Sequence, residues 1–248
     1  RIHPDDAGAY YNRALALTAL GKAREARESL DASLERDPSY APAWFQLGTI
    51  LAAQGHHDRA VEAFGTGLGL EPENAPIWFQ EGLSLLALGR EEEAVAALTR
   101  AVEISPEDTE ARCHLGYALA AVGRMEEAVE AFDQVLDTDP SRHRAWYHRG
   151  LAEMELGRHE EALASFGRSL DLSPDDPRPW HQKGLALAAL SRRGGPVGAR
   201  RLAGGRVRER PVGARTLAGR RLRERPVGPR TLAGRRFRER PVGPRTLA

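Results

Sequence analysis

Cysteine is nearly absent from this 248-residue chain, in which Cys113 is the single example. One cysteine excludes an internal disulfide framework and any metal site built from several cysteines. It fits a reducing compartment, so a cytoplasmic location is favoured, although no sequence feature determines the compartment. No apolar run approaches the roughly 18 residues that a membrane-spanning helix needs, and no signal-peptide segment is present. We therefore expect no membrane partner.

Catalytic motifs are also lacking. The chain has no glycine-rich phosphate loop, nucleophile elbow or zinc-protease histidine pair. Cys113, His114 and His148 could approach one another across neighbouring units, but a fourth metal ligand of suitable spacing is missing. The other histidines and the acidic residues recur with the repeat described next instead of converging on one pocket. We expect a protein that is not an enzyme and that holds no metal and no cofactor.

The chain contains an internal repeat of 34 residues. Prolines mark it at Pro4, Pro38, Pro72, Pro106, Pro140 and Pro174. Each unit then carries an aromatic residue, a small residue four positions later and a leucine three positions after that, a spacing that places all three on one helical face. The aromatic residues are Tyr10, Trp44, Trp78, Trp146 and Trp180, with Arg112 as the exception, and Glu153 is the exception among the leucines.

A second helical segment follows a glycine in each of the first five units. Its apolar positions are an alanine and, four residues later, a phenylalanine or leucine, as in Ala128 and Phe132. Acidic residues such as Glu126 and Glu127 cluster at its start, where the positive end of the helix dipole favours them. Proline ends it. Each unit is therefore expected to be a helical hairpin.

The strings "AWFQLGTILAAQGHHDRAVEAFGTGLGLEP" and "AWYHRGLAEMELGRHEEALASFGRSLDLSP" resemble tetratricopeptide repeats, with that family's Trp, Gly, Ala, Phe and Pro at matching positions. The likeness covers about residues 4–190. It implies an all-α fold, a right-handed superhelix of stacked hairpins whose first helices line a concave groove. The sites that depart from the family pattern are expected to be looser or more exposed, namely Arg13, Glu81, Arg149, Lys183 and Arg112.

Two neighbouring rows are expected to face this groove. The residue after the aromatic position forms an apolar row, Tyr11, Phe45, Phe79, Cys113, Tyr147 and His181, extended four residues later by positions that include Thr49 and Tyr117. The next residue forms a row that both donates and accepts hydrogen bonds: Asn12, Gln46, Gln80, His114, His148 and Gln182. The second row resembles the amide ladder that holds peptide backbone in O-linked N-acetylglucosamine transferases. A partly exposed binding floor is favoured, and packing between repeats or simple polar edging are the alternatives.

The repeat stops in its sixth unit. Ser191 replaces the hairpin glycine, and Gly194, Gly195 and Pro196 stand where the second helix should begin. The charge changes too, because residues 1–191 carry 18 Lys and Arg against 32 Asp and Glu (net −14) and residues 192–248 carry 18 Arg against 3 Glu (net +15). Two origins remain open: a disordered basic tail that binds polyanions weakly, or an out-of-frame reading of further repeats, since GC-rich codons for Glu-Glu-Ala-Leu read one base early give residues 193–197.

The expected organisation follows from these patterns. Residues 1–6 end a truncated upstream repeat, residues 7–190 form the array, and residues 191–248 form a tail with a 15-residue period. Units start near 7, 41, 75, 109 and 143, with a partial one at 177. The expected function is a scaffold that binds a protein or peptide in its groove, and the alternative is the substrate-binding arm of a larger enzyme such as a glycosyltransferase. Apart from polyanion binding by the tail, no nucleic-acid partner is expected.

Overall fold

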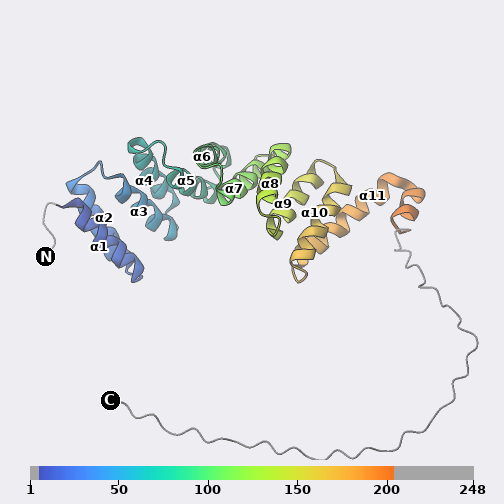
Figure 1. Ribbon diagram of the computed structural model, residues 1–248, viewed down its shortest axis with the longest axis horizontal. Coiled ribbons are helices and arrows are strands. Elements are labelled where there is room, and N and C mark those ends of the chain that lie inside the picture. The colour runs from blue at the N-terminus through green and yellow to red at the C-terminus, as the bar shows by residue number, and fades with distance from the viewer. Residues whose placement is uncertain (1–5, 204–248) are drawn as a thin grey trace, which may run out of the picture. The chain divides into compact units, whose positions relative to one another are not determined.

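The computed structural model describes residues 6–203, and side chains up to Arg192, as a series of α-helices without strands (Figure 1). Each helix packs against the helices before and after it in the chain, so the fold is a helical repeat solenoid. The expected all-α class is confirmed. The helices are α1 (Ala7–Ala19), α2 (Ala23–Arg36), α3 (Ala41–Ala53), α4 (His57–Leu70), α5 (Ala75–Ala87), α6 (Glu91–Ile104), α7 (Thr109–Ala121), α8 (Met125–Thr138), α9 (His143–Glu155), α10 (His159–Leu172) and α11 (Pro177–Ala203).

Glycine makes the turn inside each of the five complete hairpins. Gly21, Gly55, Gly89, Gly123 and Gly157 have φ values of 72°, 80°, 70°, 83° and 70°, in the left-handed region that other residues rarely adopt. In unit six Ser191 takes this place, and α11 continues to Ala203 without a turn. The helix therefore extends past the expected array end at residue 190 and through Pro196. The rest of the expected tail, residues 204–248, lies outside the described residues.

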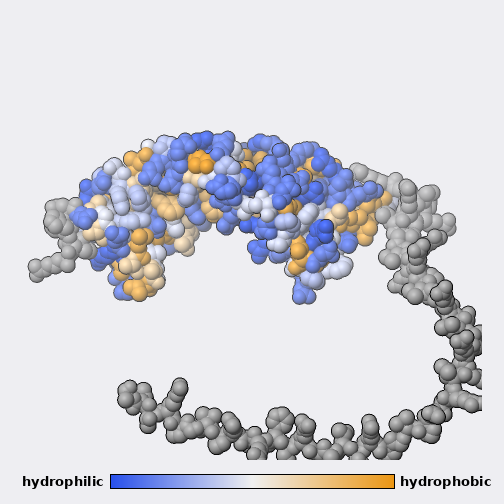
Figure 2. All heavy atoms as spheres, in the orientation of Figure 1, coloured by the Kyte–Doolittle hydropathy of each residue, from blue (hydrophilic) through white to orange (hydrophobic). Residues whose placement is uncertain are grey.

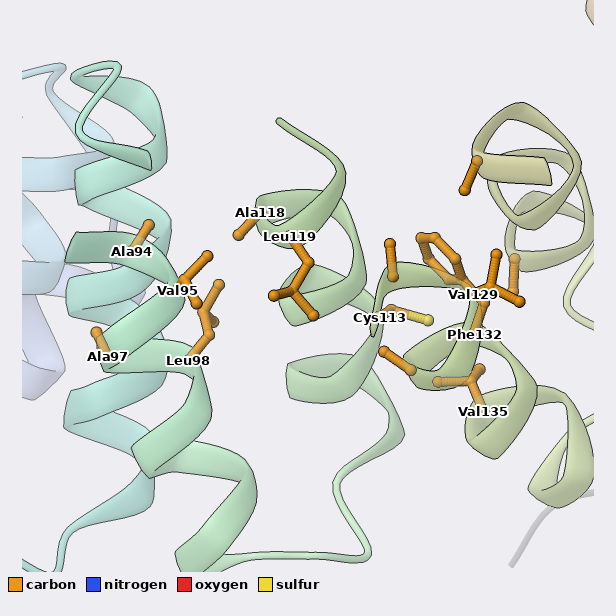
Figure 3. Packing of buried hydrophobic residues seen from close by; sticks show 14 of the residues in the cluster. Ala94, Val95, Ala97, Leu98, Cys113, Ala118, Leu119, Val129, Phe132 and Val135 are labelled. Carbon is orange, nitrogen blue, oxygen red and sulfur yellow. The ribbon is translucent and has the colours of Figure 1, made fainter. Parts of the chain in front are cut away.

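The two helices of a hairpin approach closely because a glycine of the first faces a large side chain of the second. A Cβ atom added at Gly48, Gly82, Gly116 or Gly150 would lie 2.5–2.8 Å from the Phe64, Leu98, Phe132 or Phe166 side chain. Those four side chains are fully buried. In Figure 3, Val95 and Leu98 of α6 point toward Leu119 of α7, so the same core continues from one hairpin to the next.

The tryptophan and proline of a repeat are joined by a hydrogen bond. The indole Nε1 of Trp44 donates to the carbonyl oxygen of Pro38 at 2.9 Å, and the other three tryptophans repeat this contact with their own prolines. In unit four the Arg112 guanidinium donates to the Pro106 carbonyl in the same way. The proline thus ends one helix and also anchors the next, and arginine can replace tryptophan there as a donor.

The polar departures from the repeat differ in exposure. Arg13 is exposed as expected, whereas Glu81, Arg112, Arg149 and Lys183 are only half-exposed. Their long apolar stems pack while their polar ends find partners or water. Glu81, Arg149 and Lys183 are thus more exposed than Leu47, the buried residue at the same repeat position in unit two.

The carboxyl group of Glu81 makes the stability of the array depend on pH. Burial raises its pKa from 4.5 to about 7, a shift that Arg90 opposes and Glu93 reinforces. Because the pKa of Glu81 is higher in the folded chain than in the unfolded chain, its protonated carboxyl adds to the free energy of unfolding. This contribution is fully present below pH 4.5 and is lost as the pH rises through 7. Glu81→Gln should therefore raise the free energy of unfolding by about 1–2 kcal/mol at pH 8 and leave it nearly unchanged at pH 4.5. Urea unfolding at the two pH values tests this, and equal effects at both would contradict it.

Candidate peptide-binding groove

The first helices of the repeats lie on the inside of the bend. From α3 through α11, the first helices of adjacent units contact one another, while no contact of similar extent joins two second helices in the part of the chain that the structure describes. Helices that touch on one side and diverge on the other make the touching side concave. The inner faces of α3, α5, α7 and α9 therefore form the wall of a groove.

Members of the aromatic row pack against the second helix of their own unit. The Phe45 ring lies 6.2 Å from that of Phe64, and the Tyr147 ring lies 6.0 Å from that of Phe166, so each contacts the second helix of its own unit. Tyr11, Phe45 and Phe79 remain half-exposed. Burial of the row thus varies along the array, with Cys113 and Tyr147 buried and His181 exposed.

The hydrogen-bonding row lies beside it and is largely unused within the chain. Asn12 is exposed, and the other five members are half-exposed. Within the described residues, no hydrogen bond engages the side-chain amide of Asn12, Gln46, Gln80 or Gln182. These amides can therefore donate to and accept from a ligand.

The positions four residues after the aromatic row, which include Thr49 and Tyr117, differ from one another in their contacts. The Thr49 hydroxyl donates to the Phe45 carbonyl oxygen at 2.9 Å, so it already has an intrahelical partner. The Tyr117 ring lies 4.5 Å from the His148 ring and 5.5 Å from the His114 ring, with edge-to-face geometry. The three rings form a half-buried aromatic patch at the middle of the groove.

A pocket of 340 Å³ opens beside this patch, between α7 and α9. Arg142 in its wall is held by Asp139 at 3.1 Å and by the Thr109 hydroxyl at 2.9 Å. Arg144 is exposed and has no ion pair among the described residues, so it can meet an anionic group of a ligand. The pocket is lined by Glu110, Cys113, His114, Tyr117, Arg142, His143, Arg144 and Ala145.

The basic residues of this pocket were not predicted from the sequence. The signal was the position two before the tryptophan, which is proline in units two and three and becomes charged afterwards: Pro42, Pro76, Glu110, Arg144 and Arg178. Arg178 is tied to Asp176 at 2.7 Å, and its guanidinium carbon lies 5.2 Å from the centre of the Tyr147 ring. A change of charge at a repeated, inward-facing position points to a change in what the groove contacts.

The aromatic patch resists protonation. Burial, together with the positive charges of Arg178 and Arg144, lowers the pKa of His148 from 6.5 to about 4. Burial also lowers the pKa of His114. Both imidazoles are therefore neutral near pH 7 and retain one donor and one acceptor nitrogen each.

Acid should weaken the fold through His148. Its pKa is lower in the folded chain than the ordinary 6.5, so the stability that neutral His148 permits is present above 6.5 and is lost as the pH falls toward 4. His148→Gln places there the residue found in units two, three and six. Between pH 7 and pH 5 the parent should lose about 1–2 kcal/mol of unfolding free energy that the variant keeps. Urea unfolding measures this difference, and identical losses in both proteins would contradict the assignment.

The family of the chain follows from comparison with known proteins. The family model described as tetratricopeptide repeat matches residues 2–41, 11–64, 45–109 and 113–177, which together span most of the array. The chain belongs to the tetratricopeptide-repeat family. Proteins of this family bind peptides or other proteins, so the array is a protein-interaction scaffold. No curated protein matches the chain by sequence.

Solved structures of tetratricopeptide-repeat proteins resemble this array. The crystal structure of YrrB, a TPR protein with an unusual peptide-binding site, is 30% identical, covers 73% of this chain and 93% of its own, and gives a TM-score of 0.70. MamA from Desulfovibrio magneticus RS-1 is 25% identical, covers 68% of this chain and 96% of its own, and gives a TM-score of 0.64. A second MamA structure, 22% identical over 68% of this chain and 92% of its own with a TM-score of 0.65, shows the shared fold alone.

Two further properties bear on the sequence-based expectations. Within residues 6–192, no three His, Cys, Asp or Glu side chains come close enough to share a metal ion, and this holds around Cys113 as elsewhere. Among the helices of residues 6–203, none combines the length and apolarity that crossing a membrane requires.

Proposed function

We propose that this tetratricopeptide-repeat protein binds an extended peptide of a partner protein along the inner faces of α3, α5, α7 and α9. The observation that carries the proposal is the pairing of two rows on one wall. Half-exposed rings at Phe45 and Phe79 lie one residue away from the unpaired amides of Gln46 and Gln80. Residues adjacent in a helix point about 100° apart, so the two rows form neighbouring stripes.

The two rows suit the two parts of a peptide. Rings in a wall can bury apolar side chains, which usually dominate binding energy. Side-chain amides can donate to a backbone carbonyl of the peptide and accept from a backbone N–H. Such bonds fix the position of the peptide along the array and do not depend on the peptide's sequence. The peptide-binding function of YrrB, at 30% identity, supports the same use of this fold.

Peptides selected from a random library on the full chain test the proposal. Phe45→Ala with Phe79→Ala should weaken binding by about 2 kcal/mol, near thirtyfold in Kd, because two rings of the wall are removed. Gln46→Ala with Gln80→Ala should raise Kd by a smaller factor, and this factor should be similar for every peptide. Isothermal titration calorimetry gives each Kd.

Two controls keep the result interpretable. Leu70→Ala with Leu172→Ala removes exposed leucines from the second helices α4 and α10 and should leave Kd unchanged. Each variant must show the helicity and melting of the parent, since Phe45 and Phe79 also contact the core. The amide side chains replaced in the second variant have no hydrogen-bond partner among the described residues. If the folded aromatic variant binds as tightly as the parent, peptides do not use this wall.

A further inference from the structure

The last described helix, α11, has an apolar face that no other described helix covers. Trp180 is 57% exposed and Leu187 is 42% exposed, whereas Leu51, Leu85 and Leu119, the equivalents of Leu187, are at most 5% exposed. Gly184, between them on the same face, is exposed, and a Cβ added there would meet nothing within 4 Å. Figure 2 shows apolar atoms at the surface where α11 lies. We call Trp180, Gly184 and Leu187 the terminal face.

The same face occurs in the complete units, and there the chain itself shows what covers it. In each case a second helix places a phenylalanine or leucine against the glycine or alanine of the first, as Phe132 does against Gly116. The covering helix has an alanine four residues earlier and a small or β-branched residue three residues later. The five examples are Ala26-Leu30-Ser33, Ala60-Phe64-Gly67, Ala94-Leu98-Ala101, Ala128-Phe132-Val135 and Ala162-Phe166-Ser169.

The sequence after α11 does not repeat this pattern. Ala218 with Leu222 and Ala233 with Phe237 have the first spacing, but arginine follows three residues later in both, at Arg225 and Arg240. A long charged side chain in place of serine, glycine, alanine or valine does not fit between two close helices. The chain beyond α11 therefore supplies no matching helix by its own sequence.

We infer that the terminal face binds an amphipathic helix of a partner protein that carries Ala, then Phe or Leu four residues later, then a small residue three residues after that. The aromatic or leucine side chain enters the space over Gly184, and Trp180 and Leu187 flank it. The helix completes the sixth hairpin from outside the chain. This surface is separate from the groove, so the inference does not depend on the proposed peptide binding.

A helix taken from the chain itself is the direct probe. The peptide has the sequence of α10, His159–Leu172, with a fluorescein label and a lactam joining Glu160 to a lysine introduced by Ala164→Lys; both positions are exposed in α10, so the bridge stabilises the helix on its outer side. Fluorescence anisotropy with the full chain should show saturable binding at micromolar concentration. A peptide with Phe166→Asp should bind at least tenfold more weakly.

Protein variants then locate the site. Gly184→Leu places a side chain where the partner's aromatic or leucine side chain would enter; its Cβ meets nothing within 4 Å, and binding should weaken at least tenfold. Gly69→Leu is the matched control, because Gly69 is an equally open helical glycine on α4, and it should bind as the parent does.

Three results would overturn the inference. The bridged peptide does not bind the full chain, or it binds Gly184→Leu as tightly as the parent, or sedimentation shows a dimer of the parent that Gly184→Leu dissociates. The last result would mean that a second copy of this chain, and not a partner helix, covers the terminal face.

Discussion

Arg149→Leu is expected to lower the free energy of unfolding by about 3 kcal/mol at pH 7, because it leaves a buried carboxylate without its cation. Glu153 is only 2% exposed, and its Oε1 lies 3.0 Å from Nη1 of Arg149. The same Nη1 donates to the Ser165 hydroxyl at 2.7 Å, and that hydroxyl donates to Oε2 of Glu153 at 2.6 Å. Nε of Arg149 also contacts Asp133 at 2.5 Å.

The double variant separates this explanation from simple loss of packing. Glu153 stands where units two to four have a leucine, and Arg149 stands where units two and four have one, at Leu47 and Leu115. The free energy of unfolding of the double variant Arg149→Leu with Glu153→Leu should therefore be at most about 1 kcal/mol below that of the parent, or above it. Buried ion pairs can often be replaced by apolar residues without loss of stability. Urea unfolding of the parent, both single variants and the double variant measures the coupling. Additive effects would show that the two residues act independently.

Gly116→Leu should destabilise the array by about 3 kcal/mol, because the added side chain would overlap a buried ring. A Cβ at this position lies 2.8 Å from two ring atoms of Phe132, which is fully buried. Gly69→Leu is the control, because nothing lies within 4 Å of its Cβ and leucine favours a helix over glycine. Thermal and urea unfolding compare the two. Equal stability of the Gly116→Leu variant and the control would contradict the close approach of α7 and α8.

The fold was predictable because its signals repeat. The 34-residue period, the glycine turns and the alanine and phenylalanine positions each indicated the same hairpin, and the left-handed φ of Gly123 and the buried Phe132 bear this out. The hydrogen bond from each tryptophan to its proline was not predictable, since the proline appeared only as a helix stop. For this reason Arg112 was expected to be an exception to the repeat, although its guanidinium donates the same hydrogen bond to Pro106.

The end of the array was harder to predict. Helix-breaking residues around Pro196 suggested that the helical pattern stops, yet α11 continues to Ala203. Unit six lacks the glycine that makes the hairpin turn. Ser191 stands there and adopts the left-handed conformation less readily than glycine, so the chain does not turn at the end of the first helix. Within residues 6–203, α11 therefore has no second helix of its own unit, and Trp180 is exposed.

The groove could be predicted only in outline. Periodicity placed the two rows on one side of the first helices, but burial depends on how closely neighbouring units pack, which no single position encodes. Cys113 and Tyr147 lie buried, whereas Phe45 and Phe79, at the same repeat position, lie half-exposed. The pocket lined by Arg142 and Arg144 combines residues from two units, so no single repeat encodes it, although the change from proline to a charged residue at the position of Arg144 marks part of its wall.

Photo-crosslinking of a selected peptide to the full chain tests peptide binding in the groove most directly. A photoreactive residue is placed at each peptide position in turn, and the attached protein residues are identified by mass spectrometry. The account predicts crosslinks on the inner faces of α3, α5, α7 and α9, at and around Phe45, Phe79 and Tyr117, moving along the array as the photoreactive position moves along the peptide. Crosslinks confined to the second helices α4, α6, α8 and α10, or to the terminal face of α11, would contradict it.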